Sequence, residues 1–491
     1  MSFAQRCGAD TAQRQAAVAT LVQRLQAGDI DQVRIAWCDL HGQTRVKALT
    51  VPAALRALHE GIGMVSTLVL KDSSDRTAFK VFEPGGTDTL PGFGQANNLI
   101  LLPDPTSLHT LPWSPGSAWL RAQPYFEDGS PVGLDTRRVL ERALARLAQA
   151  GYGLRCGLEV EFHIYRITDA SAQLDPVRAG WPGLPPAVEM IHPGFRLLAE
   201  DGYDLAEPAL RIVQQTAQAL GLPLASLELE MGPSQVEAVF DATDALTAAD
   251  HMVLFRNAVR MALRRGGYHA TFVCRPPFEH IMSSGWHLHQ SLVRLADGCN
   301  AMARNGPAPG SGLLDASHTL SDAGEHWLSG LLQHARGMAA LCTPTINGYG
   351  RYRPNALAPQ SVLWGRDNRG ALLRVVGAAG DSGTRIENRM GEPAANPYLT
   401  VAAQIHAGLD GLLRQLRAPP ATDHPYGQQA ERLPTSLPQA LQALQSDTAL
   451  VEGFGPDFVA WFAQIKASEI ARHAAAEDPA DFDRREYFAR F

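Results

Sequence analysis

The chain has 491 residues, of which 45% are hydrophobic and 19% are charged, a composition typical of a folded globular protein. This length exceeds what one ordinary hydrophobic core accommodates, so it predicts two domains. A net charge of −7 and a sequence pI of about 6.1 argue against nucleic acid or an anionic membrane as the main partner.

The sequence shows no sign of export or of a membrane span. No apolar run approaches the length that crosses a bilayer, and the start "MSFAQRCGAD" lacks the apolar core of a signal peptide. The cysteines are scattered without a CxxC pair, which favours reduced thiols over disulfides or a zinc site. They are Cys7, Cys38, Cys156, Cys274, Cys299 and Cys342. These features predict a soluble cytoplasmic protein.

The first part of the chain carries a hairpin pattern. After a short helical start, "QVRIAWCDLHGQTRVKALTV" alternates apolar residues on both sides of His41-Gly42, with Val33, Ile35 and Trp37 facing a core. The proline-rich stretch "LLPDPTSLHTLPWSPGSA" then reads as a connection between domains. We therefore expect a small N-terminal domain over residues 1–112 and a large C-terminal domain over 113–491.

Further elements follow in the large domain. "LDTRRVLERALARLAQAG" predicts an amphipathic helix that is capped by Asp135 or Thr136 and ends at Gly151. The stretch from Asp175 to Pro193 is rich in proline and glycine and predicts a surface loop. The last quarter of the chain is rich in Ala, Leu and Gln and predicts helices.

Two glutamates stand in the strand-like stretch "GLEVEFHIY", residues 157–165. Side chains alternate faces along a strand, so Glu159 and Glu161 point the same way. Two like charges on a half-buried face repel each other and lose hydration unless something positive lies between them. A solvated acidic face is the simpler interpretation of this stretch alone.

Three later stretches carry similar residues. "ELEMGPSQVEAVF" holds Glu228, Glu230 and Glu237 around a turn at Gly232-Pro233. "SSGWHLHQSL" places His287 and His289 on one strand face, and "TRIENRMGEPAANPYL" places Glu387 between Arg385 and Arg389. Each has a plain structural interpretation: an acidic loop, a pair of structural histidines and a salt-bridged surface strand.

Taken together, these stretches indicate a metal site. Carboxylates with a single imidazole suit Mg²⁺ or Mn²⁺. Arginines follow at positions 351, 353, 366, 369, 374, 385 and 389. Guanidinium groups beside hard cations are typical of phosphoryl transfer, which depends on positioning and charge neutralisation. Neither a GxxxxGK[ST] loop nor a kinase-type glycine loop is present.

The set "GLEVEFHIY", "ELEMGPSQVE", "SGWHLHQSL", "NGYGRYRPNALAP", "DNRGALLRV" and "TRIENRMGEPAANPYLTVAAQIHAGLDGL" resembles the glutamine synthetase superfamily, in order and along nearly the whole chain. Within it, the chain is most similar to the γ-glutamylamide synthetase-like branch, which joins glutamate to amines other than ammonia. The resemblance implies an α+β fold with a small N-terminal β-grasp domain and a large catalytic domain. It also implies a homo-oligomer of stacked rings with active sites between subunits.

The resemblance also implies roles for individual residues. Glu161, Glu230 and Glu237 match the ligands of one metal, and Glu159, His287 and Glu387 match those of another, with two to three Mg²⁺ or Mn²⁺ per site. His289, Ser291, Arg374 and Arg385 match ATP-binding positions. Arg351 matches the residue that holds the glutamate α-carboxylate, and Glu161 and Arg389 also match positions close to glutamate. Arg369 and Arg389 match catalytic arginines that balance charge.

The implied reaction makes γ-glutamyl phosphate from glutamate and ATP, and an amine then displaces phosphate. Three alternatives stay open: a metal-dependent hydrolase, a non-enzymatic relative and a housekeeping enzyme that uses ammonia. The arginine set disfavours a hydrolase, and the intact set of six metal positions disfavours a dead enzyme.

The chain departs from the family pattern in places that bear on its substrates. Met282-Ser283-Ser284-Gly285 replaces the usual "NGSG", and no clear match to the adenylylation motif exists near Tyr426. Leu357 stands where ammonia-using members carry a glutamate, and Ser66 stands where they carry an aspartate. Leu357, Ser66, Trp286, Trp364 and Tyr352 are therefore candidates for an amine pocket, although the larger ones could equally be core residues. The expected order of amines is aniline-like first, small alkyl amines second and polyamines third.

Overall fold

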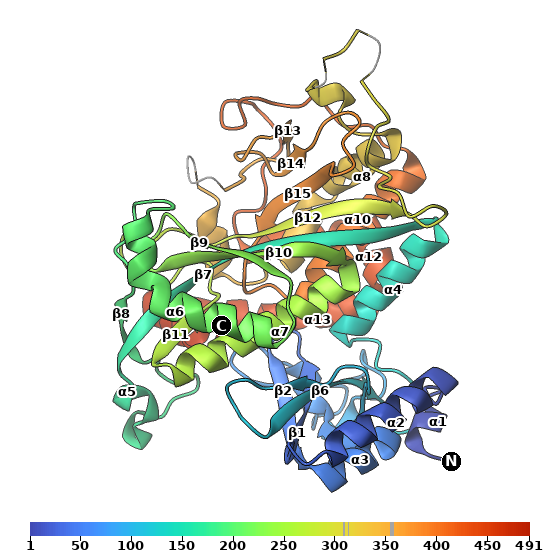
Figure 1. The fold of residues 1–491 in the computed structure, drawn as a ribbon, viewed down its shortest axis with the longest axis vertical. Coiled ribbons are helices and arrows are strands. Elements are labelled where there is room, and N and C mark those ends of the chain that lie inside the picture. The colour runs from blue at the N-terminus through green and yellow to red at the C-terminus, as the bar shows by residue number, and fades with distance from the viewer. Residues whose placement is uncertain (308–309, 313, 354–357) are drawn as a thin grey trace.

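The computed structural model describes residues 1–307, 310–312, 314–353 and 358–491. Figure 1 shows a smaller N-terminal part, coloured blue, below a larger part that holds the rest of the chain. Each part is built around one β-sheet with helices against it. The predicted α+β organisation is confirmed.

The N-terminal sheet is curled and follows the order β2-β1-β6-β4-β3, with β5 paired to β6. All its pairs are antiparallel except β1 with β6. Its strands are β1 (Gln32–Cys38), β2 (Thr44–Thr50), β3 (Ile62–Val65), β4 (Asn98–Pro103), β5 (His109–Thr110) and β6 (Ser117–Tyr125). Its helices are α1 (Phe3–Arg6), α2 (Ala12–Gln26) and α3 (Val51–Glu60), with the 3₁₀ turns η1 (Ser66–Leu70) and η2 (Gly94–Ala96).

The predicted hairpin is confirmed. Strands β1 and β2 pair from Gln32 opposite Thr50 to Cys38 opposite Thr44. Val33, Ile35 and Trp37 are buried, as their spacing of two residues requires. The domain boundary after residue 112 stays a prediction, and β6, which lies beyond it, belongs to the N-terminal sheet.

The larger sheet follows the order β13-β14-β15-β12-β7-β10-β9, and β8 and β11 pair with the far end of β7. Its strands are β7 (Tyr152–Asp169), β8 (Ala187–Met190), β9 (Leu224–Leu229), β10 (Gln235–Asp244), β11 (Tyr268–Thr271), β12 (Trp286–Arg294), β13 (Trp364–Arg366), β14 (Leu373–Val376) and β15 (Arg385–Gly391). The long strand β7 has partners along both edges, so its side chains occupy the middle of the sheet.

Helices pack against this sheet: α7 contacts β11, β7 and β10, and α6 contacts α7 and β9 (Figure 1). The helices are α4 (Thr136–Gln149), α5 (Ser171–Leu174), α6 (Glu200–Ala219), α7 (Ala245–Arg265), α8 (Asp322–Gln333), α9 (Ala335–Cys342), α10 (Pro397–Arg414), α11 (Leu437–Ser446), α12 (Thr448–Phe454), α13 (Pro456–Ala474) and α14 (Pro479–Asp483). The 3₁₀ turns are η3 (Pro176–Arg178), η4 (Ala316–His318) and η5 (Asn347–Arg351), and η6 (Arg484–Phe488) is a π turn.

The helix predictions are confirmed at both ends of this part. Asp135 caps α4, since its carboxylate accepts the backbone N–H of Arg138 at 3.0 Å. The last quarter of the chain is helical from α10 to α14, but it begins with the strands β14 and β15, which the prediction of helices did not include. The predicted loop from Asp175 to Pro193 differs in part, because it contains η3 and the edge strand β8, which pairs with β7.

Two further expectations concern the thiols and the membrane. All six cysteines are free thiols. Among the described residues, no helix is both long enough and apolar enough to cross a membrane.

Candidate active site

Strand β7 places Glu159 and Glu161 on one face of the larger sheet, and its neighbours add the other side chains. Glu161 lies opposite Glu237 of β10, and Glu159 lies opposite His287 of β12. On the next strand, Glu387 of β15 lies opposite His289. Glu230 follows directly after β9. Strand register therefore brings together carboxylates that are far apart in the sequence.

The first group consists of Glu159, His287 and Glu387. His287 Nδ1 lies 3.5 Å from Glu159 Oε2 and 3.7 Å from Glu387 Oε1. One ligand atom from each of the three residues lies within 4.8 Å of the others, which suits a single metal ion. Burial, and then Arg389, lower the pKa of His287 to about 4, so its imidazole is neutral at pH 7 and able to bind a cation.

The two carboxylates of this group are kept ionised. Burial alone would raise the pKa of Glu159, yet hydrogen bonds from His287 and His289 hold it well below its ordinary value. The pKa of Glu387 is likewise lowered against the effect of burial, by His287, Arg389 and His289. An anionic pair beside a neutral imidazole is the ligand state that a divalent cation requires.

The second group consists of Glu161, Glu230 and Glu237. His287 Nε2 lies 3.6 Å from Glu161 Oε1 and so connects the two groups. The pKa of Glu161 is raised to about 7, mainly by burial and next by the charge of Glu230. The pKa of Glu237 is raised to about 10, mainly by burial and next by the charge of Glu161. Within the described part of the chain, Glu237 Oε1 is buried without a hydrogen-bond partner. Crowded carboxylates with an unsatisfied oxygen fit a cation that would relieve their repulsion.

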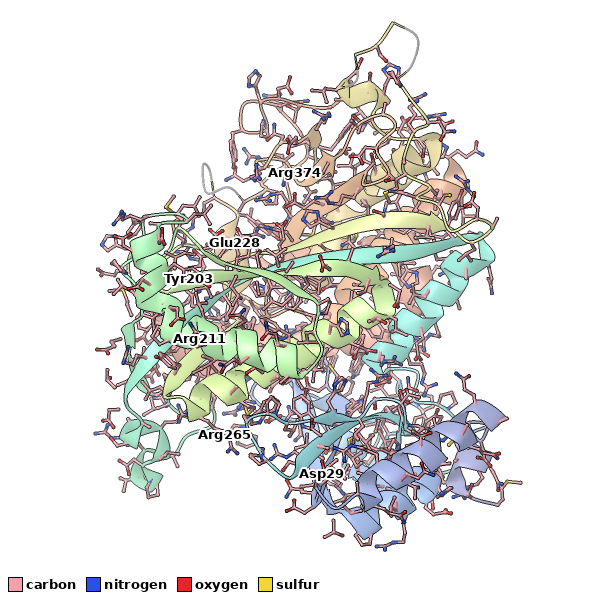
Figure 2. All side chains as sticks on the ribbon, in the orientation of Figure 1. Asp29, Tyr203, Arg211, Glu228, Arg265 and Arg374 are labelled. Atoms are coloured by element: carbon pink, nitrogen blue, oxygen red, sulfur yellow. The ribbon has the colours of Figure 1, made fainter. Side chains whose placement is uncertain are left out.

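Arginines border the first group. Arg374 Nη1 donates to Glu387 Oε2 at 2.9 Å and Arg389 Nη1 donates to Glu387 Oε1, so both guanidinium groups reach the candidate metal ligand. Arg385 Nε donates to His289 Nδ1 at 3.0 Å. Arg369 is exposed in the turn between β13 and β14. Figure 2 shows Arg374 in the upper half of the larger part.

Arg351 is buried at the end of η5. Its Nη1 donates to the backbone carbonyls of Arg389 at 2.9 Å, Met390 at 3.1 Å and Gly391 at 3.0 Å. Its Nη2 lies 3.3 Å from His287 Nε2, beside the candidate metal ligands. The guanidinium is therefore fixed against the end of β15 rather than held by a flexible side chain.

A cleft of about 960 Å³ opens beside the first group. Glu159, His289, Ser291 and Arg385 line it, which brings together three of the four predicted ATP-binding residues. The sequence analysis missed Arg155, Asn300, Arg304 and Asn305 in this cleft. Arg155 could have been found, because it precedes Glu159 by four residues on the same strand and so shares its face.

Gln235 is a second residue that the sequence analysis missed. Its Nε2 donates to Glu161 Oε2 at 3.1 Å and to the carbonyl of Ser283 at 3.2 Å. The backbone N–H of Gly285 donates to the same Glu161 oxygen at 2.9 Å. These contacts orient Glu161. The available signal was a glutamine two residues before Glu237 in an apolar strand.

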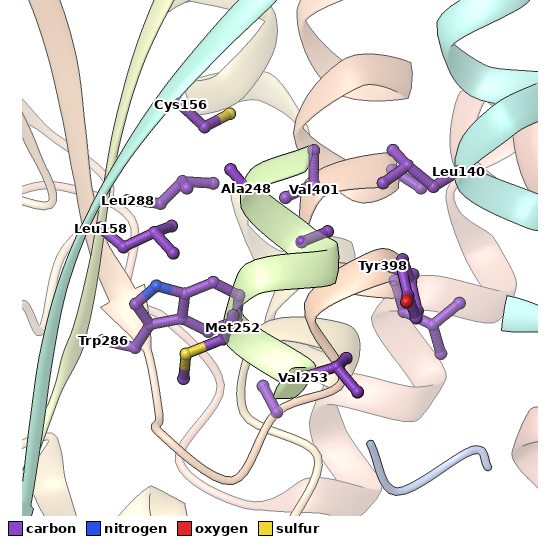
Figure 3. Close-up of a cluster of buried hydrophobic side chains, with 14 of the residues drawn as sticks. Leu140, Cys156, Leu158, Ala248, Met252, Val253, Trp286, Leu288, Tyr398 and Val401 are labelled. Atoms are coloured by element: carbon purple, nitrogen blue, oxygen red, sulfur yellow. The ribbon is translucent and has the colours of Figure 1, made fainter. Parts of the chain in front are cut away.

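The predicted amine pocket does not assemble as expected. Trp286 precedes His287 on β12 and so points to the opposite face, where it is 1% exposed. Figure 3 shows it among Leu158, Leu288 and Met252, beside helix α7. Trp286 therefore belongs to the hydrophobic core, and its assignment to the pocket was wrong.

The other pocket candidates have different outcomes. Trp364 also lies in the core, and its Nε1 donates to the carbonyl of Pro419 at 2.7 Å. Ser66 is buried in the N-terminal part, where its N–H donates to the carbonyl of Asn97 at 2.8 Å. Tyr352 is half-buried, and its hydroxyl donates to the carbonyl of Met390 at 3.0 Å. Leu357 lies outside the described residues.

Comparison with known protein families gives a match over most of the chain. The model described as "Glutamine synthetase, catalytic domain" matches residues 133–486. The chain belongs to the glutamine synthetase family. This glutamine synthetase family member is accordingly an ATP-dependent glutamate–amine ligase. The family uses ATP and divalent metals, and the group of Glu159, His287 and Glu387 fits a metal.

Individual relatives cover nearly the whole length. A γ-glutamylanilide synthase of Acinetobacter sp is 36% identical over 473 residues, covering 95% of this chain and 92% of that protein. A γ-glutamylethanolamide synthetase of Streptomyces coelicolor is 31% identical over 471 residues, covering 94% of each. The solved structure of a GmaS/ADP complex superposes with a TM-score of 0.75 at 28% identity, covering 95% of this chain and 98% of that one.

Proposed function

We propose that this glutamine synthetase family member joins the γ-carboxylate of L-glutamate to a primary amine other than ammonia, with aniline-like aromatic amines preferred. The observation that supports the choice of amine is an apolar rim beside Glu230, a member of the second carboxylate group. The similarity to a γ-glutamylanilide synthase over 95% of the chain supports the same choice.

The apolar rim consists of Phe195, Leu198 and Met231. The N–H of Phe195 donates to the carbonyl of Met231 at 2.6 Å, and that of Leu198 donates to the carbonyl of Leu229 at 3.2 Å. These two hydrogen bonds hold residues 195–198 against the backbone of residues 229 and 231, which flank Glu230. The three rim side chains are 56%, 62% and 36% exposed, respectively. Large apolar groups at a candidate metal-binding carboxylate provide a surface for the body of an apolar substrate.

In the first step, the γ-carboxylate of glutamate attacks the terminal phosphorus of ATP, giving γ-glutamyl phosphate and ADP. The nucleotide lies in the cleft lined by His289, Ser291 and Arg385, and Arg351 holds the α-carboxylate of glutamate. Divalent cations would be held by Glu159, His287 and Glu387 and by Glu161, Glu230 and Glu237, and they would supply charge neutralisation during phosphoryl transfer. Arg369 and Arg389 contribute further positive charge beside the phosphate oxygens, where negative charge develops in the transition state.

In the second step, the amine nitrogen attacks the acyl carbon, the bond from that carbon to the phosphate oxygen breaks, and the nitrogen gives its extra proton to the departing phosphate. An aryl amine is neutral at pH 7, so it reacts without first giving up a proton. Ammonium would have to lose its hydration in a site where Leu357 and Ser66 stand in place of the acidic residues of ammonia-using members, which is unfavourable. Ethanolamine is the second candidate, because a γ-glutamylethanolamide synthetase shares 31% identity. From the resemblance to the glutamine synthetase superfamily, we also propose that the chain forms a homo-oligomer of stacked rings.

The test compares kcat/KM for ammonium, aniline, isopropylamine, ethanolamine and putrescine under identical conditions with glutamate and ATP. We expect aniline to rank first and ammonium last. Ammonium as the best substrate would refute the proposal, and activity with putrescine alone would refute the order of amines. Phosphate release that needs ATP but no amine would favour hydrolysis instead.

A pair of variants tests the rim itself. Phe195→Ala should lower kcat/KM for aniline more than for ethanolamine, because the aryl ring loses its contact surface. Leu174→Ala is the matched control, since Leu174 is 73% exposed on α5 and is not part of the rim. Equal losses for both amines, or equal effects of both variants, would remove the rim from the amine site.

A further inference from the structure

The turn that precedes Arg351 is held by a buried carboxylate that the reaction described above does not use. Glu392 follows directly after β15 and has no exposed surface. Its Oε1 accepts the N–H of Thr345 at 2.7 Å, and its Oε2 accepts the Thr345 hydroxyl at 2.8 Å. Its own N–H donates to the carbonyl of Cys342 at 2.9 Å. Glu392 therefore binds the chain just before η5 at three points.

The approach between this carboxylate and the turn is close. The N–H of Gly348 donates to Thr345 Oγ1 at 3.0 Å, which continues the contacts from Glu392 into η5. A Cβ atom at Gly348 would lie 2.5 Å from Glu392 Oε2, a distance that side chains do not tolerate. Glycine is therefore favoured at position 348, because the buried Glu392 carboxylate leaves no room for a Cβ atom.

The same end of β15 receives the guanidinium of Arg351. The three carbonyls that accept Arg351 Nη1 belong to residues 389–391, immediately before Glu392. These hydrogen bonds form a closed network, called the circuit below: Glu392 binds Thr345, Thr345 leads into η5, and Arg351 at the end of η5 binds the end of β15, next to Glu392. A second bond fixes η5 from the other side, because the N–H of Arg275 donates to Asn347 Oδ1 at 2.8 Å.

We propose that Glu392 is a positioning residue that holds Arg351 in place for the α-carboxylate of the amino-acid substrate. The inference rests on the proposed function, in which Arg351 binds that carboxylate. Glu392 itself does not touch the substrate. Preorganised guanidinium groups bind carboxylates more tightly, because less freedom is lost on binding.

The kinetic test uses Glu392→Gln and Thr345→Val. The glutamine amide presents a donor where the carboxylate accepts, so the proton of the Thr345 hydroxyl loses its acceptor, although the hydroxyl oxygen can still accept from the amide. We expect the KM for glutamate to rise about tenfold, as the loss of about one hydrogen bond would give, with kcat and the KM for ATP within about twofold of wild type. Thr345→Ser keeps the hydroxyl and should restore the wild-type KM. The double variant should be no worse than the poorer single variant, since both changes break the same circuit.

Hydrogen exchange provides a readout that does not depend on turnover. In Glu392→Gln, the amides of Thr345 and Gly348 should exchange faster than in wild type. The control is Asp135→Asn. Asp135 is another buried carboxyl, which accepts a hydrogen bond from Trp37 Nε1 at 2.8 Å and has no part in the contacts around Glu392. It should lower the melting temperature and leave both the glutamate KM and the exchange of Thr345 unchanged.

Each outcome decides a separate question. Unchanged exchange at Thr345, or an unchanged glutamate KM in Glu392→Gln, overturns the positioning role. A loss confined to kcat also overturns it. If Arg351→Lys leaves the glutamate KM unchanged, the glutamate clamp of the proposed function fails, whatever Glu392→Gln does to the exchange of Thr345.

Discussion

Adding a divalent metal to metal-free enzyme should release protons, because the second carboxylate group (Glu161, Glu230 and Glu237) holds protons in its metal-free state. Two carboxylates about 4 Å apart repel by about 4 kcal/mol at an effective dielectric constant of about 20, which corresponds to about three pKa units. The pKa of Glu237, raised to about 10 by burial and by Glu161, Glu159 and Glu230, agrees with such crowding. Glu161 has a pKa raised to about 7, for the same two reasons.

The expected number of protons follows from these values. At pH 7 Glu237 is protonated and Glu161 is about half protonated, so the metal-free site carries about one to two protons. A divalent cation binds ionised carboxylates, so its binding releases about one to two protons per site. At pH 8.5 Glu161 is already ionised, and the release should fall towards about one proton. Apparent metal affinity should therefore rise with pH, since protons compete with the cation.

The assay is isothermal titration of Mg²⁺ or Mn²⁺ into chelator-treated enzyme, in two buffers with different ionisation enthalpies. The difference between the observed enthalpies gives the number of protons released. Glu237→Gln removes the group with the highest pKa in the site, so its proton release should fall below about one. An enthalpy that is the same in both buffers for wild-type enzyme would refute the reasoning about the crowded carboxylates.

Three further predictions concern individual residues. Glu161→Ala or His287→Ala should abolish turnover while the far-ultraviolet circular dichroism stays that of the wild type, and full wild-type activity in excess chelator would contradict the metal assignment. Arg351→Lys should raise the glutamate KM about 10- to 100-fold, from about 1.5–3 kcal/mol of lost bidentate binding, and a change confined to kcat would count against it. Trp286→Ala should lower the free energy of unfolding in urea by about 3–5 kcal/mol without changing the order of amines, and an altered order would return Trp286 to the amine site.

The part of the site that the sequence predicts best is the part built on strands. A spacing of two residues places Glu159 and Glu161 on one face whatever the neighbouring strands are, and the same rule applies to His287 and His289. The predicted hairpin and the capped helix at Asp135 also follow from local patterns. Local rules suffice here because each side chain's direction is set by its own strand.

The rest depended on contacts that local patterns do not contain. Alternation along β12 already implied that Trp286 and His287 face opposite ways, yet which face is the core depends on the packing of α7 against the sheet. Gln235 and Glu392 act through partners more than 40 residues away in the sequence. The rim was missed because Phe195 and Leu198 lie just beyond the loop predicted from Asp175 to Pro193, in a segment for which the sequence predicted no structure.

The apolar rim also has a consequence for how such an enzyme could diversify. Phe195 and Leu198 both have positive φ angles, 60° and 54°, and more than half of each side chain is exposed. At these φ angles β-branched residues are strained, whereas exchanges among other exposed side chains usually change stability by no more than about 0.5 kcal/mol. The carboxylates, in contrast, are fixed by the register of four strands. Selection, or a saturation library at these two positions, can therefore explore new amines while the strands that hold the carboxylates stay constant.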